Sequence, residues 1–134
     1  MYKQPYRIRM HDTDAAGILF FTSQLRIAHE TFEAFLDGVG LGLGVIMGAR
    51  DYRIPIVHAE SDYRAPVHLG DLLSVEVALA RVGRTSFALR TRFVSAAGLE
   101  TGAVTTVQVA VDARTWQKRP LPDELRRALA AGLS

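Results

Sequence analysis

The sequence predicts an α+β protein in which one antiparallel β-sheet wraps around a single long α-helix. The first third of the chain carries one stretch with helical apolar periodicity, and the remainder carries several stretches that alternate like strands. A single long helix must bury its apolar stripe, and the apolar face of a curved sheet is the only surface available. With 134 residues, we expect residues 1–134 to form one domain.

The N-terminal segment has the pattern of a half-buried strand followed by a turn. Residues 5–11 alternate, with Tyr6, Ile8 and Met10 on one side and polar residues between them. The polar segment DTDAAG follows and ends in Gly17, which is typical of a turn. A strand is therefore expected to lead directly into the helical region.

The long helix is predicted over residues 22–38. Its apolar positions recur at steps of three and four: Leu25, Ala28, Phe32, Phe35 and Val39. Thr22 or Ser23 is the expected N-cap, because its hydroxyl can accept a free amide of the first turn. Gly38 and Gly40 are expected to end the helix.

Strand patterns occupy most of the rest of the chain. After a glycine-rich connection they cover residues 51–64, 72–82, 85–94 and 103–112. Pro55 favours a sheet edge or bulge, and short turns favour an antiparallel meander. In the last strand Val107, Val109 and Val111 are the expected apolar face, and Pro122 opens a short terminal helix. A sheet wrapped around one long helix is the architecture called the hotdog fold.

Composition excludes several classes of protein. The absence of cysteine rules out disulfides, thiolate metal sites and a cysteine nucleophile. The net charge is only +2 and the 16 basic residues are scattered, so no nucleic-acid surface is expected. No apolar stretch approaches the roughly 20 residues that span a bilayer. The N-terminus also lacks a signal-peptide pattern, so we expect a cytoplasmic protein.

The segment Asp12-Thr-Asp14-Ala-Ala-Gly17 contains the candidate catalytic residues. It lies between a strand end and a helix start, where unpaired amides carry partial positive charge and can hold a developing oxyanion. A nearby carboxylate can attack a carbonyl or activate water. A thioester suits this pair, because its thiol leaves with a pKa of about 8.5 and needs no strong general acid. On spacing alone, capping and turn chemistry are favoured over catalysis.

The run DTDAAGILFF, followed by AHETFE, resembles the 4-hydroxybenzoyl-CoA thioesterase family of hotdog proteins. The resemblance implies that Asp14 is the catalytic carboxylate and that the backbone amide of Phe21 polarises the thioester carbonyl. It also implies that Gly17 lets the loop pass close to the substrate, with Asp12 as loop support. Coenzyme A would be part of the substrate, and no separate cofactor or metal is implied.

A narrower resemblance concerns the substrate. LRIAHETFEAFL and IPIVHAESDYRAPVHLGD are similar to the 1,4-dihydroxy-2-naphthoyl-CoA hydrolases of menaquinone and phylloquinone synthesis. A broad-specificity short-chain or benzoyl-type thioesterase and a non-catalytic acyl-CoA-binding module are the alternatives. A hydratase is disfavoured, because Leu19 stands where those enzymes place a histidine. The resemblance also implies a homodimer or homotetramer that pairs sheets edge to edge, with active sites at the seam.

Five further residues are candidates for substrate binding. Glu30 on the helix could assist a water, although a solvated glutamate explains it equally well. His58 lies in an apolar strand, where a core or interface histidine is the usual role. Arg81 and Arg84 flank a predicted turn and could meet the phosphates of coenzyme A, with Ser86 beside them. A solvated hairpin tip explains the two arginines nearly as well.

Two other positions favour structural roles. His29 and Glu33 lie one helical turn apart, but no third ligand is evident, so a side-chain pair is favoured over a metal site. Trp116 is expected to serve packing rather than recognition.

Overall fold

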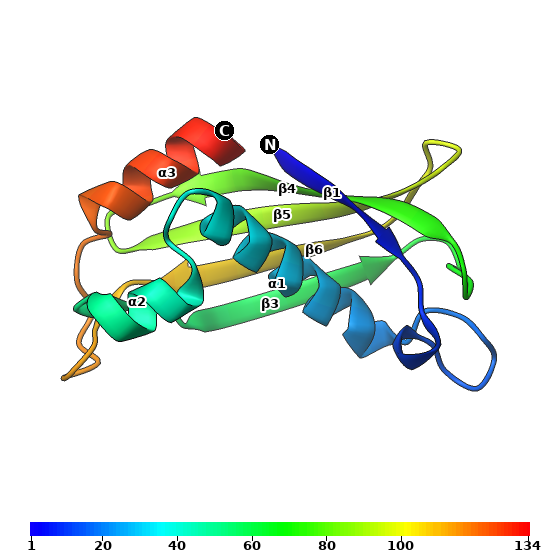
Figure 1. Ribbon diagram of the computed structural model, residues 1–134, viewed down its shortest axis with the longest axis horizontal. Helices are drawn as coiled ribbons and strands as arrows, with labels where there is room; N and C mark the ends of the chain where they lie inside the picture. Colours follow the sequence, from blue (N-terminus) through cyan, green and yellow to red (C-terminus); the bar gives the residue numbers. More distant parts are fainter.

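The computed structural model describes residues 1–134 and has the predicted α+β architecture, with one long helix lying across an antiparallel sheet (Figure 1). A short 3-10 turn spans Met10–Asp12. The helices are α1 (Phe21–Gly38), α2 (Leu43–Ala49) and α3 (Asp123–Leu133). The strands are β1 (Tyr2–Arg7), β2 (Tyr52–Arg53), β3 (Ile56–Tyr63), β4 (Leu72–Val82), β5 (Ser86–Ser95), β6 (Glu100–Val109) and β7 (Val111–Asp112).

The main sheet has the order β1-β4-β5-β6-β3 and is antiparallel throughout. Strands β4, β5 and β6 form the predicted meander, and β3 pairs with β6 at one edge. Pro55 immediately precedes this edge strand, which confirms its predicted placement at a sheet edge. The short β2 and β7 form a separate two-stranded sheet that the alternation pattern did not predict.

Strands β4 and β5 each bury one alternating face. In β4, Leu73, Val75 and Val77 are buried. In β5, the buried face consists of Phe87, Leu89, Thr91 and Phe93. The ring of Phe87 lies 6.0 Å from that of Phe32 on α1, so this is the face that packs against the long helix.

The face predicted for β6 does not face the helix, although Val109 and Val111 are buried. Opposite residues of an antiparallel pair point to the same side, and the helix-facing Phe87 and Leu89 pair with Gln108 and Thr106. The helix-facing column of β6 is therefore Gly102, Val104, Thr106 and Gln108. Val107 pairs with Ala88 on the opposite side. The pairing register with β5, which is a long-range property, decides the face.

Three element boundaries differ from the sequence prediction. The first strand ends at Arg7, and Met10 is 78% exposed because the chain enters the 3-10 turn. The N-cap of α1 is Phe20, without a side-chain cap, so Thr22 and Ser23 lie inside the first turn. The glycine-rich connection contains α2, where burial of Ile46 in the core compensates for poor helix propensity.

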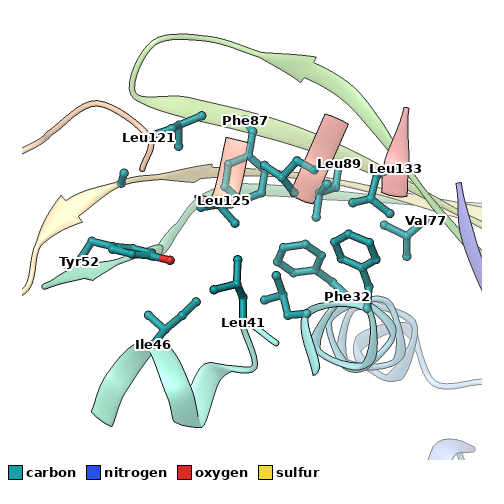
Figure 2. Close-up of a cluster of buried hydrophobic side chains, with 14 residues drawn as sticks. Phe32, Leu41, Ile46, Tyr52, Val77, Phe87, Leu89, Leu121, Leu125 and Leu133 are labelled. Atoms are coloured by element: carbon teal, nitrogen blue, oxygen red, sulfur yellow. The ribbon is translucent and has the colours of Figure 1, made fainter. Parts of the chain in front are cut away.

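Two apolar clusters hold α1 onto the sheet. The larger lies between the second half of α1, α2, α3 and the adjacent end of the sheet (Figure 2). Leu125 and Leu133 of α3 belong to the same cluster as Phe32 of α1. The smaller cluster joins the first half of α1, through Ile27 and Ala28, to the opposite end of the sheet. The start of α1 is therefore fixed relative to the strand ends beside it.

No single helix is long and apolar enough to cross a membrane. Only α1 and α2 taken together reach that length and composition, and they are bent by 64° at their junction.

Gly102 marks the closest approach of the helix to the sheet. A Cβ atom there would lie 2.5 Å from Oε1 of Gln24 on α1 and 2.6 Å from the backbone oxygen of Asp62 on β3. Real Cβ atoms do not approach that closely. Only glycine lets α1, β3 and β6 meet at this point.

We therefore expect Gly102→Ala to lower the free energy of unfolding by about 1–3 kcal/mol through overpacking. Urea denaturation followed by circular dichroism measures the change. Gly44→Ala is the matched control, because a Cβ at this exposed position of α2 meets nothing within 4 Å. It should stabilise by roughly 0.4–1 kcal/mol. Equal stability of Gly102→Ala and wild type would contradict the close approach.

Candidate active site

The segment between Asp12 and Phe20 is a tight hairpin. The Phe20 amide donates to the Asp12 carbonyl at 2.9 Å, and the Asp14 amide donates to the Ile18 carbonyl at 2.9 Å. Gly17 closes the turn with φ of +77°, a left-handed conformation that favours glycine. The structure gives Gly17 a turn-forming role, and its close approach to substrate remains a prediction.

Asp14 is an exposed residue of this hairpin and lines a cleft of about 460 Å³. Its Oδ1 accepts hydrogen bonds from the amides of Ala16 at 2.9 Å and Ile18 at 3.4 Å. These two bonds orient the carboxylate, and none of the side-chain hydrogen bonds engages Oδ2. One oxygen is thus held by the turn, and the other is available to a ligand in the cleft.

The N-terminus of α1 borders the same cleft. Phe20 and Phe21 both line it. The amides of Phe21 and Thr22 have no carbonyl one turn earlier in the helix, and neither donates to the backbone outside it. No acidic residue occupies the first turn, so the partial positive charge of the helix end is not neutralised. A carboxylate and an electropositive helix end therefore face one cavity.

Asp12 is fully buried below the hairpin and ties it to both neighbouring elements. Its carboxylate accepts hydrogen bonds from the Tyr6 hydroxyl on β1 at 3.0 Å and from the Arg9 amide at 2.8 Å. Arg26 of α1 forms an ion pair with it. Burial opposes the charge, but the bonds from Arg9, Tyr6 and Arg26 outweigh it and lower the pKa of Asp12. The structure thus gives Asp12 the supporting role expected of it.

Three polar residues of the cleft were not identified from the sequence. Gln24 of α1 is buried and donates to the Ser61 hydroxyl and the Asp62 carbonyl of β3, each at 2.9 Å. The Tyr63 hydroxyl donates to the carbonyl of Phe21, and Arg64 lines the cleft beside it. Tyr63 and Arg64 belong to the run SDYRAP, which lies in the segment that resembles the 1,4-dihydroxy-2-naphthoyl-CoA hydrolases. This resemblance is the signal that could have identified them.

Two predicted substrate-binding residues lie outside the cleft of the protomer. Glu30 is exposed and pairs with Arg26 at 2.8 Å. His58 pairs in register with Val107, so it points away from α1, and its Nε2 lies 3.4 Å from Oε1 of Glu60. Neither residue lines the cavity that contains Asp14.

Arg81, Arg84 and Ser86 lie around the β4–β5 turn, at the opposite end of β4 from the strand end beside the Asp14 hairpin. The turn is anchored to α3, because Arg126 donates to the carbonyls of Gly83 at 2.9 Å and Arg84 at 3.3 Å. Within one protomer the structure does not bring these residues to Asp14. Their predicted contact with coenzyme A remains a prediction.

The two positions with expected structural roles differ in outcome. His29 and Glu33 form the expected side-chain pair, with Nε2 and Oε1 3.1 Å apart, and no group of three metal-ligating side chains occurs in the structure. The packing role expected of Trp116 is wrong. Its side chain is 60% exposed, because a left-handed turn with φ of +59° turns it outward.

We expect Asp12→Asn to lower the free energy of unfolding by about 2 kcal/mol at pH 7, because a buried, multiply bonded charge is lost. The lowered pKa of Asp12 gives stability above its unfolded value of about 3.9, and that stability disappears as the pH falls through the folded pKa. The difference between variant and wild type should therefore shrink in acid. Urea unfolding at several pH values measures it.

Asp51→Asn is the control for this change. Asp51 pairs with Arg119 at 3.0 Å, but its side chain is 80% exposed, so its loss should cost under about 1 kcal/mol. Equal effects of the two substitutions would refute the supporting role of Asp12.

Comparison with known proteins agrees with this fold. The sequence model of the thioesterase-like superfamily matches residues 8–129 of the chain. A 1,4-dihydroxy-2-naphthoyl-CoA hydrolase from Synechococcus elongatus is 37% identical over 120 residues, covering 89% of this chain and 88% of that protein. The enzyme of the same name from Acaryochloris marina is 34% identical over 120 residues, covering 88% of each.

A solved structure shows the same architecture. The crystal structure of a 1,4-dihydroxy-2-naphthoyl-CoA thioesterase from Synechocystis superposes with a TM-score of 0.90 at 28% identity, covering 96% of this chain and 95% of that one. The predicted fold and family are therefore confirmed, and the chain belongs to the thioesterase-like superfamily of hotdog proteins.

Proposed function

We propose that the protein hydrolyses 1,4-dihydroxy-2-naphthoyl-CoA, with Asp14 as the catalytic carboxylate and the first amides of α1 as the oxyanion donors. The observation that carries the proposal is the shared cleft of Asp14, Phe20 and Phe21. Membership of the thioesterase-like superfamily supports thioester hydrolysis. The names of the relatives from Synechococcus and Acaryochloris support the dihydroxynaphthoyl group.

The chemistry needs only these two features. In one route Oδ2 of Asp14 attacks the thioester carbon, the C–S bond breaks, and coenzyme A leaves as a thiolate that takes a proton from water. A water molecule then hydrolyses the mixed anhydride to the free acid. In the other route Asp14 removes a proton from a water molecule that attacks the same carbon. Both routes place negative charge on the carbonyl oxygen, which the amides of Phe21 and Thr22 stabilise.

The edges of the sheet support a homodimer formed through β3. Edge strand β1 is protected against pairing by Lys3, Pro5 and Arg7. Edge strand β3 has eight residues and no proline or lysine, and it exposes the apolar side chains of Ile56, Val57 and Tyr63. Pairing of two β3 strands would satisfy their free backbone groups and place a second subunit beside the cleft.

This dimer bears on the predicted contacts with coenzyme A. Antiparallel pairing of two β3 strands places the far end of one subunit next to the Asp14 end of the other. Arg81, Arg84 and Ser86 would then approach the substrate from the partner subunit. The exposed guanidinium groups of Arg81 and Arg84 suit phosphate oxygens.

We expect Asp14→Asn to fold like wild type and to lose at least about 100-fold in kcat, because it removes the nucleophile or base. Turnover of 1,4-dihydroxy-2-naphthoyl-CoA, benzoyl-CoA and butyryl-CoA is followed with a thiol-reactive dye. The matched control is Asp71→Asn, since Asp71 also accepts a turn amide, that of His68 at 2.9 Å, but lies outside the cleft. Wild-type turnover by Asp14→Asn would overturn the catalytic assignment. If the wild-type protein bound acyl-CoA without releasing thiol, it would be a binding module.

We expect light scattering to give twice the protomer mass or a multiple of it, and Val57→Asp to shift the protein toward the monomer. The new carboxylate would lie in a seam already containing Glu60 and Asp62, where like charges repel. Leu99→Asp is the control, because Leu99 is 57% exposed, close to the 59% of Val57, but lies on the β5–β6 turn. A monomeric wild type would refute the proposed dimer through β3.

A further inference from the structure

The first turn of α1 receives a hydrogen bond from a side chain outside the helix. The hydroxyl of Tyr63 donates to the carbonyl of Phe21, which is the first residue of α1. Tyr63 is the last residue of β3, and it lines the cleft that contains Asp14. No other side chain donates to a carbonyl of this turn. The contact therefore links the edge strand to the end of the helix that borders the site.

One peptide unit connects this carbonyl to a donor of the proposed mechanism. The carbonyl of Phe21 and the amide of Thr22 belong to the same planar, resonance-stabilised unit. A hydrogen bond accepted at the oxygen draws electron density from the nitrogen, so the N–H group becomes a stronger donor. Such cooperative strengthening is about 10–30% per bond. Tyr63 therefore strengthens the amide of Thr22, one of the two free amides at the start of α1.

The other free amide does not depend on Tyr63. The amide of Phe21 belongs to the peptide unit whose carbonyl is that of Phe20. That carbonyl accepts the amide of Ser23 at 3.0 Å, so the chain itself holds this unit. Loss of the Tyr63 hydroxyl should therefore weaken the oxyanion site without abolishing it.

The hydroxyl of Tyr63 is not needed to hold α1 against β3. Gln24 does this, because it donates to the Ser61 hydroxyl and to the Asp62 carbonyl, each at 2.9 Å. Gln24 is 1% exposed, whereas Tyr63 is 48% exposed. An exposed hydrogen bond adds little to stability, since water competes for both partners. Removal of the Tyr63 hydroxyl should thus leave the fold intact.

We propose that Tyr63 is a positioning residue of the oxyanion site, whose hydroxyl holds the Phe21–Thr22 peptide and strengthens the amide of Thr22 as a donor to the thioester oxygen. A tyrosine hydroxyl has one hydrogen, and that of Tyr63 is donated to the Phe21 carbonyl. It therefore acts through the helix end and donates nothing to the substrate or to the leaving thiolate. The inference rests on the proposed function, which assigns the thioester oxygen to the first amides of α1.

We expect Tyr63→Phe to lower kcat for 1,4-dihydroxy-2-naphthoyl-CoA by about 2–8-fold, because a donor whose removal costs about 10²–10³-fold is weakened by about 10–30%. KM should stay close to the wild-type value, since negative charge on the oxygen develops only in the transition state. The single-turnover rate of thiol release should fall by the same factor as kcat. A circular dichroism melting curve like that of wild type establishes that the variant is folded.

Tyr2→Phe is the matched control. The hydroxyl of Tyr2 donates to Oε1 of Gln4 at 3.2 Å, and neither residue lines the cleft, so this variant should keep the wild-type kcat. A wild-type kcat in Tyr63→Phe would overturn the inference. An increase in KM alone would also overturn it, because Tyr63 would then be a substrate-binding residue.

The carbonyl band of the bound substrate reports the strength of the oxyanion donors. Substrate with an isotopic label at the thioester carbon is bound to Asp14→Asn, and the infrared difference from unlabelled substrate isolates this band. Stronger donation to the oxygen lowers its frequency. We expect a higher frequency when Tyr63→Phe is added to Asp14→Asn and no change when Tyr2→Phe is added. An unmoved band in the Tyr63→Phe combination would contradict polarisation of the Thr22 amide.

A stronger donor at the same position should have the opposite effect. Replacement of Tyr63 by a tyrosine fluorinated beside the hydroxyl keeps the shape of the side chain and makes the hydroxyl more acidic. At about pH 6 the hydroxyl still carries its proton, since tyrosine titrates near 10. We expect the carbonyl band to move to lower frequency than in Asp14→Asn alone. A shift to higher frequency, which a merely loosened helix end would cause, or no shift would refute the inference.

Failure of this inference is distinguishable from failure of the proposed function. Turnover by Asp14→Asn at the wild-type rate would refute the catalytic role of Asp14. A wild-type kcat in Tyr63→Phe, together with an inactive Asp14→Asn, would refute only the role of Tyr63.

Discussion

The buried carboxylate of Asp12 is the interaction on which the geometry of the site depends. It joins Tyr6 of β1 and Arg26 of α1, and the backbone of the same residue receives the amide of Phe20, directly before the helix. Hydrogen bonds and one ion pair compensate for its desolvation. Because these contacts fix both ends of the hairpin, Asp14 and the first amides of α1 keep one relative position without a ligand. Such preorganisation is what stabilisation of an oxyanion requires.

The sheet divides its helix-facing surface into an apolar part and a polar part. Strands β4 and β5 supply the large buried side chains that hold α1. Strand β6 instead presents Gly102, where Gln24 closes against β3, and Gln108, whose amide has no partner in the protein. Packing therefore fixes the helix on one side, while the side nearest β3 borders the Asp14 cleft.

The sequence predicted what depends on local periodicity and missed what depends on long-range pairing. The span of α1 and the faces of β4 and β5 follow from apolar spacing, so they were predictable. The face of β6 depends on its register against β5, and α2 forms because the core buries Ile46. At the site, the position of Asp14 close to the helix start follows from local spacing, whereas Gln24 and Gln108 become buried only through strands distant in the chain. Trp116 was misjudged because its exposure depends on a left-handed turn.

The most direct test of the central claim is a crystal structure with a thioether analogue of 1,4-dihydroxy-2-naphthoyl-CoA that keeps the carbonyl group. We expect the carbonyl carbon about 3–3.5 Å from Oδ2 of Asp14. Its oxygen should lie about 2.7–3.1 Å from the amide of Phe21 or Thr22. An analogue bound with its carbonyl away from both groups would contradict the account.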